Sequence, residues 1–225
     1  MTISPTTGRI IGRIAWISAF VATVLGVLHA LARHATVSGQ SDLDSPLTSA
    51  WAVPAAEALR PLLNWSDPDM VYLSYGKLWA PIAIAFTLCA FVAYSLRRPA
   101  GFEKWVWRSM LAGYVLASIA VLGYYVPWLL DVFFVLLMAP GLLLSLVASS
   151  VLGVLLIRRR FRPTPAAWLL TVSFPLLFVI PLFTSLGNVL LPLVWAWAIT
   201  GRRISRGPLE RATVAPTEVN SRVRR

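Results

Sequence analysis

The sequence predicts an all-α, polytopic membrane protein, a bundle of six transmembrane helices with both termini in the cytoplasm. Its composition is 58% hydrophobic and only 13% charged, which is unlike that of an ordinary soluble domain. The apolar residues gather in runs of about the 20 residues that a helix needs to cross a bilayer. The basic residues fall almost entirely on one side of the membrane when the chain is threaded this way, as the positive-inside bias requires.

This segregation of basic residues sets the predicted orientation. Only Arg33, Arg60 and Lys77 of the 20 Lys and Arg residues lie outside the segments assigned to the cytoplasm. The net charge of +11 is therefore spread over short loops and a tail, which argues against nucleic acid as a partner. The expected partner is anionic lipid at the inner face of the plasma membrane. The cytoplasmic basic residues are Arg9, Arg13, Arg97, Arg98, Lys104, Arg108, Arg158, Arg159, Arg160, Arg162, Arg202, Arg203, Arg206, Arg211, Arg222, Arg224 and Arg225.

The first predicted span covers residues 14–32 and follows two arginines. A basic start, an apolar core and the A-x-A-like sequence at residues 30–32 also fit a cleaved signal peptide, although polytopic proteins usually keep their first helix. Both alternatives leave the loop of residues 33–77 outside, and this loop holds five of the nine acids. The second span then covers residues 78–96.

The third and fourth spans come from one long apolar run, residues 109–157, which has 49 residues. A single helix of that length would measure about 73 Å, more than twice the hydrocarbon thickness. The run must therefore fold back on itself. Pro127 and Asp131 lie near its centre and place the turn there, which gives spans at residues 109–127 and 131–157.

The fifth and sixth spans share residues 166–200, which are too many for one comfortable span and slightly few for two. Basic residues flank both sides, so the charge pattern demands an even number of crossings. We expect two short spans at residues 166–183 and 186–200, with a re-entrant hairpin as the alternative. The transmembrane domain thus covers residues 1–203, and the Arg-rich, aperiodic tail of residues 204–225 is expected to be disordered.

Few residues carry recognisable chemistry. The chain has no zinc-protease, nucleophile-elbow or phosphate-loop motif, and its two histidines, His29 and His34, lie five residues apart on different helix faces. We therefore predict no metal and no cofactor. His34 with the outer acids Asp67 and Asp69 could form a catalytic surface site, although acids in this loop are more simply explained as its solvated outer face.

The turn between the third and fourth spans supplies one further carboxylate. Asp131 is the only charge in the run of residues 109–157, and Tyr124 and Tyr125 lie close enough in the sequence to hydrogen-bond it. Ionisable groups within a bilayer are often functional. We interpret Asp131 as an interfacial turn residue, because water at the outer surface would solvate its charge.

Small residues recur every four positions along the fourth span and form a flat ridge that lets another helix approach closely. We favour packing within the chain over a homodimer or another membrane-protein partner. These residues are Gly141, Ser145, Ser149 and Gly153.

The final hairpin carries Pro175, Pro181 and Asn188. Short segments interrupted by Gly or Pro are a pointer to transporter binding sites, so these three residues are the candidate binding residues. Kinks that merely fit helices together are the alternative.

Three classes of function remain. The first is a non-catalytic accessory, scaffold or assembly component of a bacterial cell-envelope complex, which fits the small number of ionisable residues left for chemistry. The second is a small permease or lipid-handling transporter that uses the hairpin of residues 166–200. The third is a membrane enzyme with an outer-surface His/Asp site. We favour the first and expect no enzymatic activity.

Overall fold

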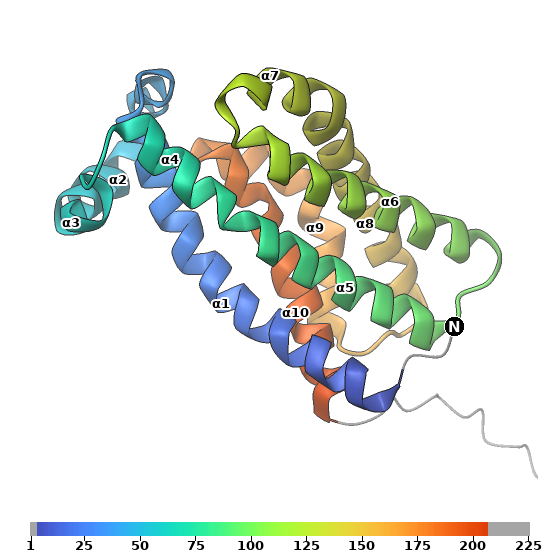
Figure 1. The fold of residues 1–225 in the computed structure, drawn as a ribbon. Coiled ribbons are helices and arrows are strands. Elements are labelled where there is room, and N and C mark those ends of the chain that lie inside the picture. The colour runs from blue at the N-terminus through green and yellow to red at the C-terminus, as the bar shows by residue number, and fades with distance from the viewer. Residues whose placement is uncertain (1–3, 207–225) are drawn as a thin grey trace, which may run out of the picture.

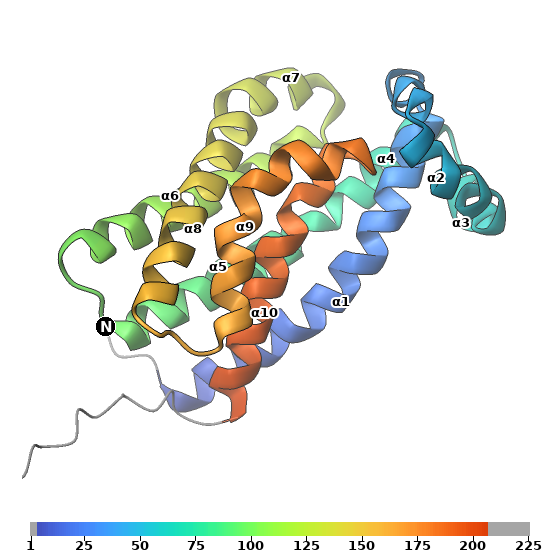
Figure 2. The same ribbon diagram turned by 180° about the vertical axis from the view of Figure 1, so that it is seen from behind.

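The computed structural model describes residues 4–206, and every regular element among them is a helix. Five helical segments within this range are long and apolar enough to cross a membrane. A shorter helix, α10 (Leu191–Arg206), returns antiparallel beside the last of them (Figures 1 and 2). The five longer segments are Pro5–Ala35, Pro68–Arg97, Gly101–Tyr124, Leu130–Arg158 and Thr164–Leu182.

The helices follow one another up and down through the bundle, and four short elements connect α1 to α5 (Figure 1). The long helices other than α10 are α1 (Pro5–Ala35), α5 (Trp79–Arg97), α6 (Gly101–Tyr124), α8 (Ala139–Arg158) and α9 (Thr164–Val179). The connecting elements are a 3-10 helix (Val37–Asp44), α2 (Pro46–Ala58), α3 (Arg60–Leu63) and α4 (Pro68–Lys77). The turns hold 3-10 segments (Pro127–Leu129, Ile180–Leu182 and Leu186–Leu190), α7 (Leu130–Phe133) and a π-helical segment (Phe134–Met138).

Several helices begin earlier than the apolar runs of the sequence. The segment that contains α5 begins at Pro68 because Asp67 caps α4, accepting a hydrogen bond from the Asp69 amide at 3.0 Å. Helix α6 begins at Gly101, although its first turns carry charged residues. Hydropathy therefore marks the apolar stretch within each helix and not the helix ends. At the other end of the chain, residues 204–206 belong to α10, and residues 207–225 of the expected tail lie outside the described residues.

The two ends of the bundle differ in charge. One end, which we call the basic end, holds the start of α1, the α5–α6 and α8–α9 connections and the end of α10 (Figures 1 and 2). The opposite end, the long-loop end, holds residues 36–78 and the α6–α8 and α9–α10 turns. All the described basic residues that the sequence assigns to the cytoplasm belong to segments at the basic end.

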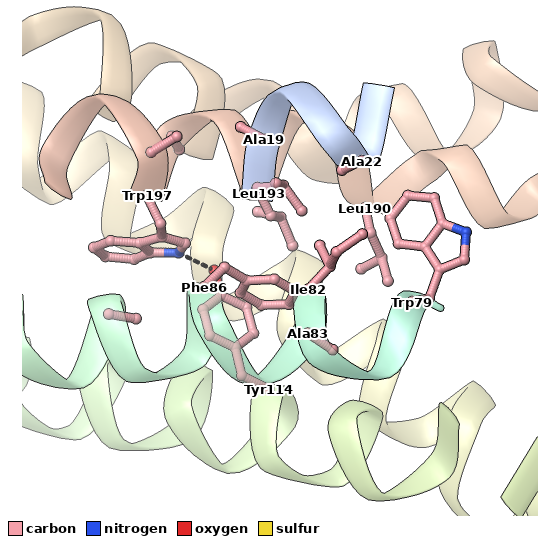
Figure 3. Close-up of a cluster of buried hydrophobic side chains, with 14 of the residues drawn as sticks. Ala19, Ala22, Trp79, Ile82, Ala83, Phe86, Tyr114, Leu190, Leu193 and Trp197 are labelled. Atoms are coloured by element: carbon pink, nitrogen blue, oxygen red, sulfur yellow. Dashed lines mark hydrogen bonds between the residues drawn. The ribbon is translucent and has the colours of Figure 1, made fainter. Parts of the chain in front are cut away.

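Aromatic and small side chains fill the core between α5, α6 and α10. Trp197, which is fully enclosed, donates from its indole nitrogen to the Tyr114 hydroxyl at 2.9 Å (Figure 3). Phe86 packs edge-on against the Tyr114 ring, with 5.1 Å between ring centroids. On the other side of α10, the buried Ala19 and Ala22 of α1 leave room for Leu193 (Figure 3).

The small residues of α8 lie against two neighbouring helices of the same chain. A Cβ atom on Gly141 would stand 3.0 Å from the Ala117 amide nitrogen of α6, and one on Gly153 would stand 2.4 Å from the Thr171 amide of α9. Ser149 forms a hydrogen bond of 2.7 Å with the Tyr114 hydroxyl. Ser145, also fully buried, lies against Gly113 of α6. This face of α8 is therefore occupied within the chain.

Candidate ligand-binding pocket

A partly open cavity of about 300 Å³ lies at the long-loop end of the bundle. Its walls come from α1, α4, α5, α6, α8, the α6–α8 connection and the turn between α9 and α10. Its volume is at the lower limit of the range for small-molecule sites, which are typically concave and mostly apolar. Nearly every membrane segment of the chain therefore contributes to one cavity.

The floor of the cavity is apolar and continuous with the core. Ala83 of α5, Val121 of α6 and Leu190 at the start of the α10 segment lie there, and Leu142 of α8 closes one side. Figure 3 shows Trp79, Ala83 and Leu190 beside the aromatic core, with the indole nitrogen of Trp79 on the ring edge facing away from it. The floor is suited to hydrocarbon.

An aromatic cluster forms one wall. His29 of α1 stacks on Tyr72 of α4, with ring centroids 4.8 Å apart, and its Nε2 atom is 3.0 Å from the Tyr125 hydroxyl. The rings of Tyr124 and Tyr125 are 4.8 Å apart. Gly76 makes this wall possible, because a Cβ atom there would stand 2.0 Å from the Tyr125 ring.

Two charged side chains line the cavity, Arg33 from α1 and Asp131 from α7. Arg33 lies one turn beyond His29 on α1, and its Nε atom donates to the Asp42 carboxylate at 2.9 Å. Asp131, in α7, lies at the cavity and is exposed. Since Asp42 follows α1 in the 3-10 helix, its pairing with Arg33 also attaches the long loop to the end of α1.

Three buried polar atoms along the cavity have no hydrogen-bond partner among the described residues. They are the indole nitrogen of Trp79, the Nδ1 atom of His29 and the hydroxyl of Ser185. Each side chain is at least 95% buried. Buried polar groups are nearly always hydrogen-bonded, so an unpaired group calls for a specific explanation. The residues that carry these three atoms all line one cavity, whose occupant, water or a ligand, is in a position to pair with them.

The predicted binding residues of the last hairpin take other positions. Asn188 is buried and donates to the Gly26 carbonyl at 3.2 Å and to the Thr184 hydroxyl at 2.7 Å, which anchors the α9–α10 turn on α1. Pro175 and Pro181 lie exposed on the surface of the bundle. The turn contributes to the cavity through residues 185–187 instead.

The predicted His/Asp site is also arranged differently. His34 is buried beside a second cavity of about 320 Å³, and its Nδ1 atom lies 3.8 Å from Asp42. Asp67 and Asp69 are exposed in the first turn of α4, where neither forms an ion pair with His34. No cluster of three or more metal-ligating residues occurs within residues 4–206.

Two pocket residues were not among the binding residues expected from the sequence. His29 had no assigned role and Asp131 was interpreted as an interfacial turn residue, and both line the cavity with Tyr124 and Tyr125. The proximity of Asp131 to the two tyrosines was the available signal. No sequence signal connects these residues to His29, because the contact joins α1 to the end of α6, 96 residues away.

Comparison with known proteins gives no relative from which a role could be transferred: no protein family, curated protein or solved structure matches this chain. A function for this chain must therefore be inferred from the chemistry of the cavity itself.

Proposed function

We propose that this chain is a six-span protein of the bacterial plasma membrane, with both termini in the cytoplasm, that binds a lipid in the pocket at its long-loop end. One observation supports the orientation. All the described basic residues except Arg33, Arg60 and Lys77 gather at one end of the bundle, and the positive-inside bias places such an end in the cytoplasm. The pocket then opens at the outer surface.

Helix α10 is proposed as the sixth crossing. Its apolar residues 191–200 span about 15 Å as an α-helix, and the preceding 3-10 segment (Leu186–Leu190) adds about 10 Å. Together they come close to a hydrocarbon core of about 30 Å. Two full crossings and a re-entrant hairpin both satisfy the charge pattern, so this length is what supports the sixth crossing.

One observation carries the proposal of a lipid ligand: His29, Trp79 and Ser185, each with an unpaired buried polar atom, line a cavity whose other lining residues are largely apolar. A lipid has the same two-part character, with polar headgroup atoms joined to hydrocarbon. At the outer interface the headgroup would meet the aromatic wall and the charged mouth, while the start of an acyl chain would occupy the floor.

We assign binding without a chemical reaction. The Nε2 atom of His29 pairs with the Tyr125 hydroxyl, and both side chains are buried in this contact, which supports a structural role for the pair. This combines the first two classes expected from the sequence, a non-catalytic membrane component and a lipid-handling protein. An accessory role in a larger envelope complex stays a prediction alongside it.

A substitution at the mouth of the pocket tests the proposal. Leu186 lines the cavity and is 42% exposed, so Leu186→Trp should narrow the cavity without disturbing the core. Leu182→Trp is the matched control, because Leu182, which is 54% exposed, lies in the same turn and does not line the cavity. We expect native mass spectrometry of the purified chain to detect retained lipid in wild type and in the control, and much less in Leu186→Trp. Equal retention in all three proteins would contradict the proposal.

A further inference from the structure

We infer that the lipid bound in this pocket has a zwitterionic headgroup, with an ammonium group held by the tyrosine wall and Asp131 and a phosphate beside Arg33. The inference rests on the proposed function and names the class of headgroup that the same site selects. It follows from three features of the cavity: its aromatic lining, its charge balance and the terminal nitrogens of Arg33.

The aromatic lining is suited to a cation. Tyr72, Tyr124, Tyr125 and Trp79 line the one cavity, and the rings of Tyr72 and Tyr125 pack edge to face, 5.8 Å apart. Aromatic rings carry negative charge on their faces, and sites lined by several rings bind organic ammonium groups. The hydroxyl and indole N–H groups of the same wall can donate to phosphate oxygens.

The charges at the mouth favour a cation as well. Arg33 is paired with Asp42, whereas Asp131 forms no ion pair with any residue that the structure describes. Of the side chains that line the cavity, Arg33 is the positive one and Asp131 the negative one, and Asp131 is the one without a partner of opposite charge among the described residues. An ammonium group near Asp131 would neutralise it, and a headgroup with only negative charge would be repelled.

Arg33 provides for the phosphate that a zwitterionic phospholipid also carries. Its ion pair with Asp42 uses the Nε atom, and its two terminal nitrogens form no ion pair with any residue that the structure describes. A guanidinium group binds phosphate oxygens through such paired donors. The cavity therefore offers a phosphate site on α1 and an ammonium site on the side of α6 and α7, as the headgroup of phosphatidylethanolamine requires.

Two lipids with the same acyl chains test the inference. Phosphatidylethanolamine and phosphatidylglycerol both carry the phosphate, but only the first carries an ammonium group. We expect the full chain in detergent to bind phosphatidylethanolamine about fivefold more tightly, since the contribution of one exposed charge pair is of the order of 1 kcal/mol. Asp131→Asn should remove this preference. Asp69→Asn is the matched control, because Asp69 is an exposed acid of the same loop end that does not line the cavity.

The outcomes separate this inference from the function on which it rests. Equal binding of the two lipids, with both lost in Leu186→Trp, would overturn the headgroup assignment and leave the lipid pocket in place. If the wild-type protein bound neither lipid, the proposed function itself would be overturned. Free phosphoethanolamine, which lacks acyl chains, should compete at least a hundredfold more weakly than the lipid. Competition at equal strength would overturn the lipid as the source of the headgroup and assign the pocket to a soluble zwitterion.

Discussion

Glu103 and Arg159 form an ion pair at the basic end, with the Glu103 Oε2 atom 2.6 Å from Nη1 of Arg159. The Glu103 side chain is only 1% exposed. Its other oxygen accepts from Arg97 and, at 3.2 Å, from the Trp107 indole nitrogen. One buried carboxylate thereby joins the end of α5, the first turn of α6 and the connection after α8.

Replacing this carboxylate should destabilise the bundle. Glu103→Gln keeps the shape of the side chain but leaves Arg97 and Arg159 without their counter-charge. Hydrogen bonds to charged groups contribute about 1.5–3 kcal/mol, and exposure of Arg159 to water moderates the loss, so we expect a reduction in the free energy of unfolding of about 2 kcal/mol. Thermal unfolding in detergent measures it. Glu57→Gln, at an exposed position, should leave the melting temperature unchanged, and an equal fall in both variants would contradict the role of the ion pair.

This ion pair illustrates how much of the fold the sequence predicted. The apolar runs correctly indicated an all-helical chain with several segments long and apolar enough to span a membrane, five of which occur among the described residues, because helix length and hydropathy are local properties of the sequence. The same analysis assigned Arg97 and Arg159 only to topology. Their ion pairs are with Glu103, which lies 56 residues before Arg159. No local sequence pattern predicts that these two segments are in contact.

The pocket was harder to predict than the fold for the same physical reason. Asn188 stood out as a polar residue in an apolar hairpin, and the structure places it in a hydrogen bond to Gly26 across the α9–α10 turn and α1. His29 looked like an ordinary interfacial residue, and its contacts come from Tyr72 and Tyr125. Sequence periodicity locates a polar residue on a helix but does not identify the helix that it faces.

The crossing of α1 and α10 should depend on the absence of a side chain at Gly12. A Cβ atom there would stand 2.3 Å from the Gly201 carbonyl oxygen, a backbone atom that cannot move aside alone. We expect Gly12→Ala to separate the two helices and to lower the free energy of unfolding by about 1–3 kcal/mol. Gly8→Ala is the matched control one turn earlier, because its Cβ atom would meet only side-chain carbons at 3.6 Å and beyond. A similar melting temperature for both variants would contradict this account.

Gly76 should control the geometry of the aromatic wall. Gly76→Ala places a methyl group into the Tyr125 ring, so the ring must shift away from α4 and lose its hydrogen bond to His29. We expect lipid retention to fall severalfold, because the wall that the headgroup contacts is displaced, and a loss of about 1 kcal/mol of contact energy corresponds to about a fivefold change in affinity. Gly101→Ala is a poor control because Gly101 has a positive φ of 58°. Gly8→Ala, far from the pocket, serves better and should keep its lipid.

The membrane topology of the last hairpin can be tested with single cysteines. The one natural cysteine, Cys89, is fully buried and its thiol contacts the Trp197 carbonyl, so the unmodified chain should resist a membrane-impermeant maleimide. Leu186→Cys places a thiol in the exposed α9–α10 turn, and Ala100→Cys places one in the exposed α5–α6 connection. With six crossings and both termini inside, Leu186→Cys should react in intact cells, whereas Ala100→Cys should react only after lysis. Protection of both thiols until lysis would indicate a re-entrant hairpin, because the turn would then never reach the outer surface.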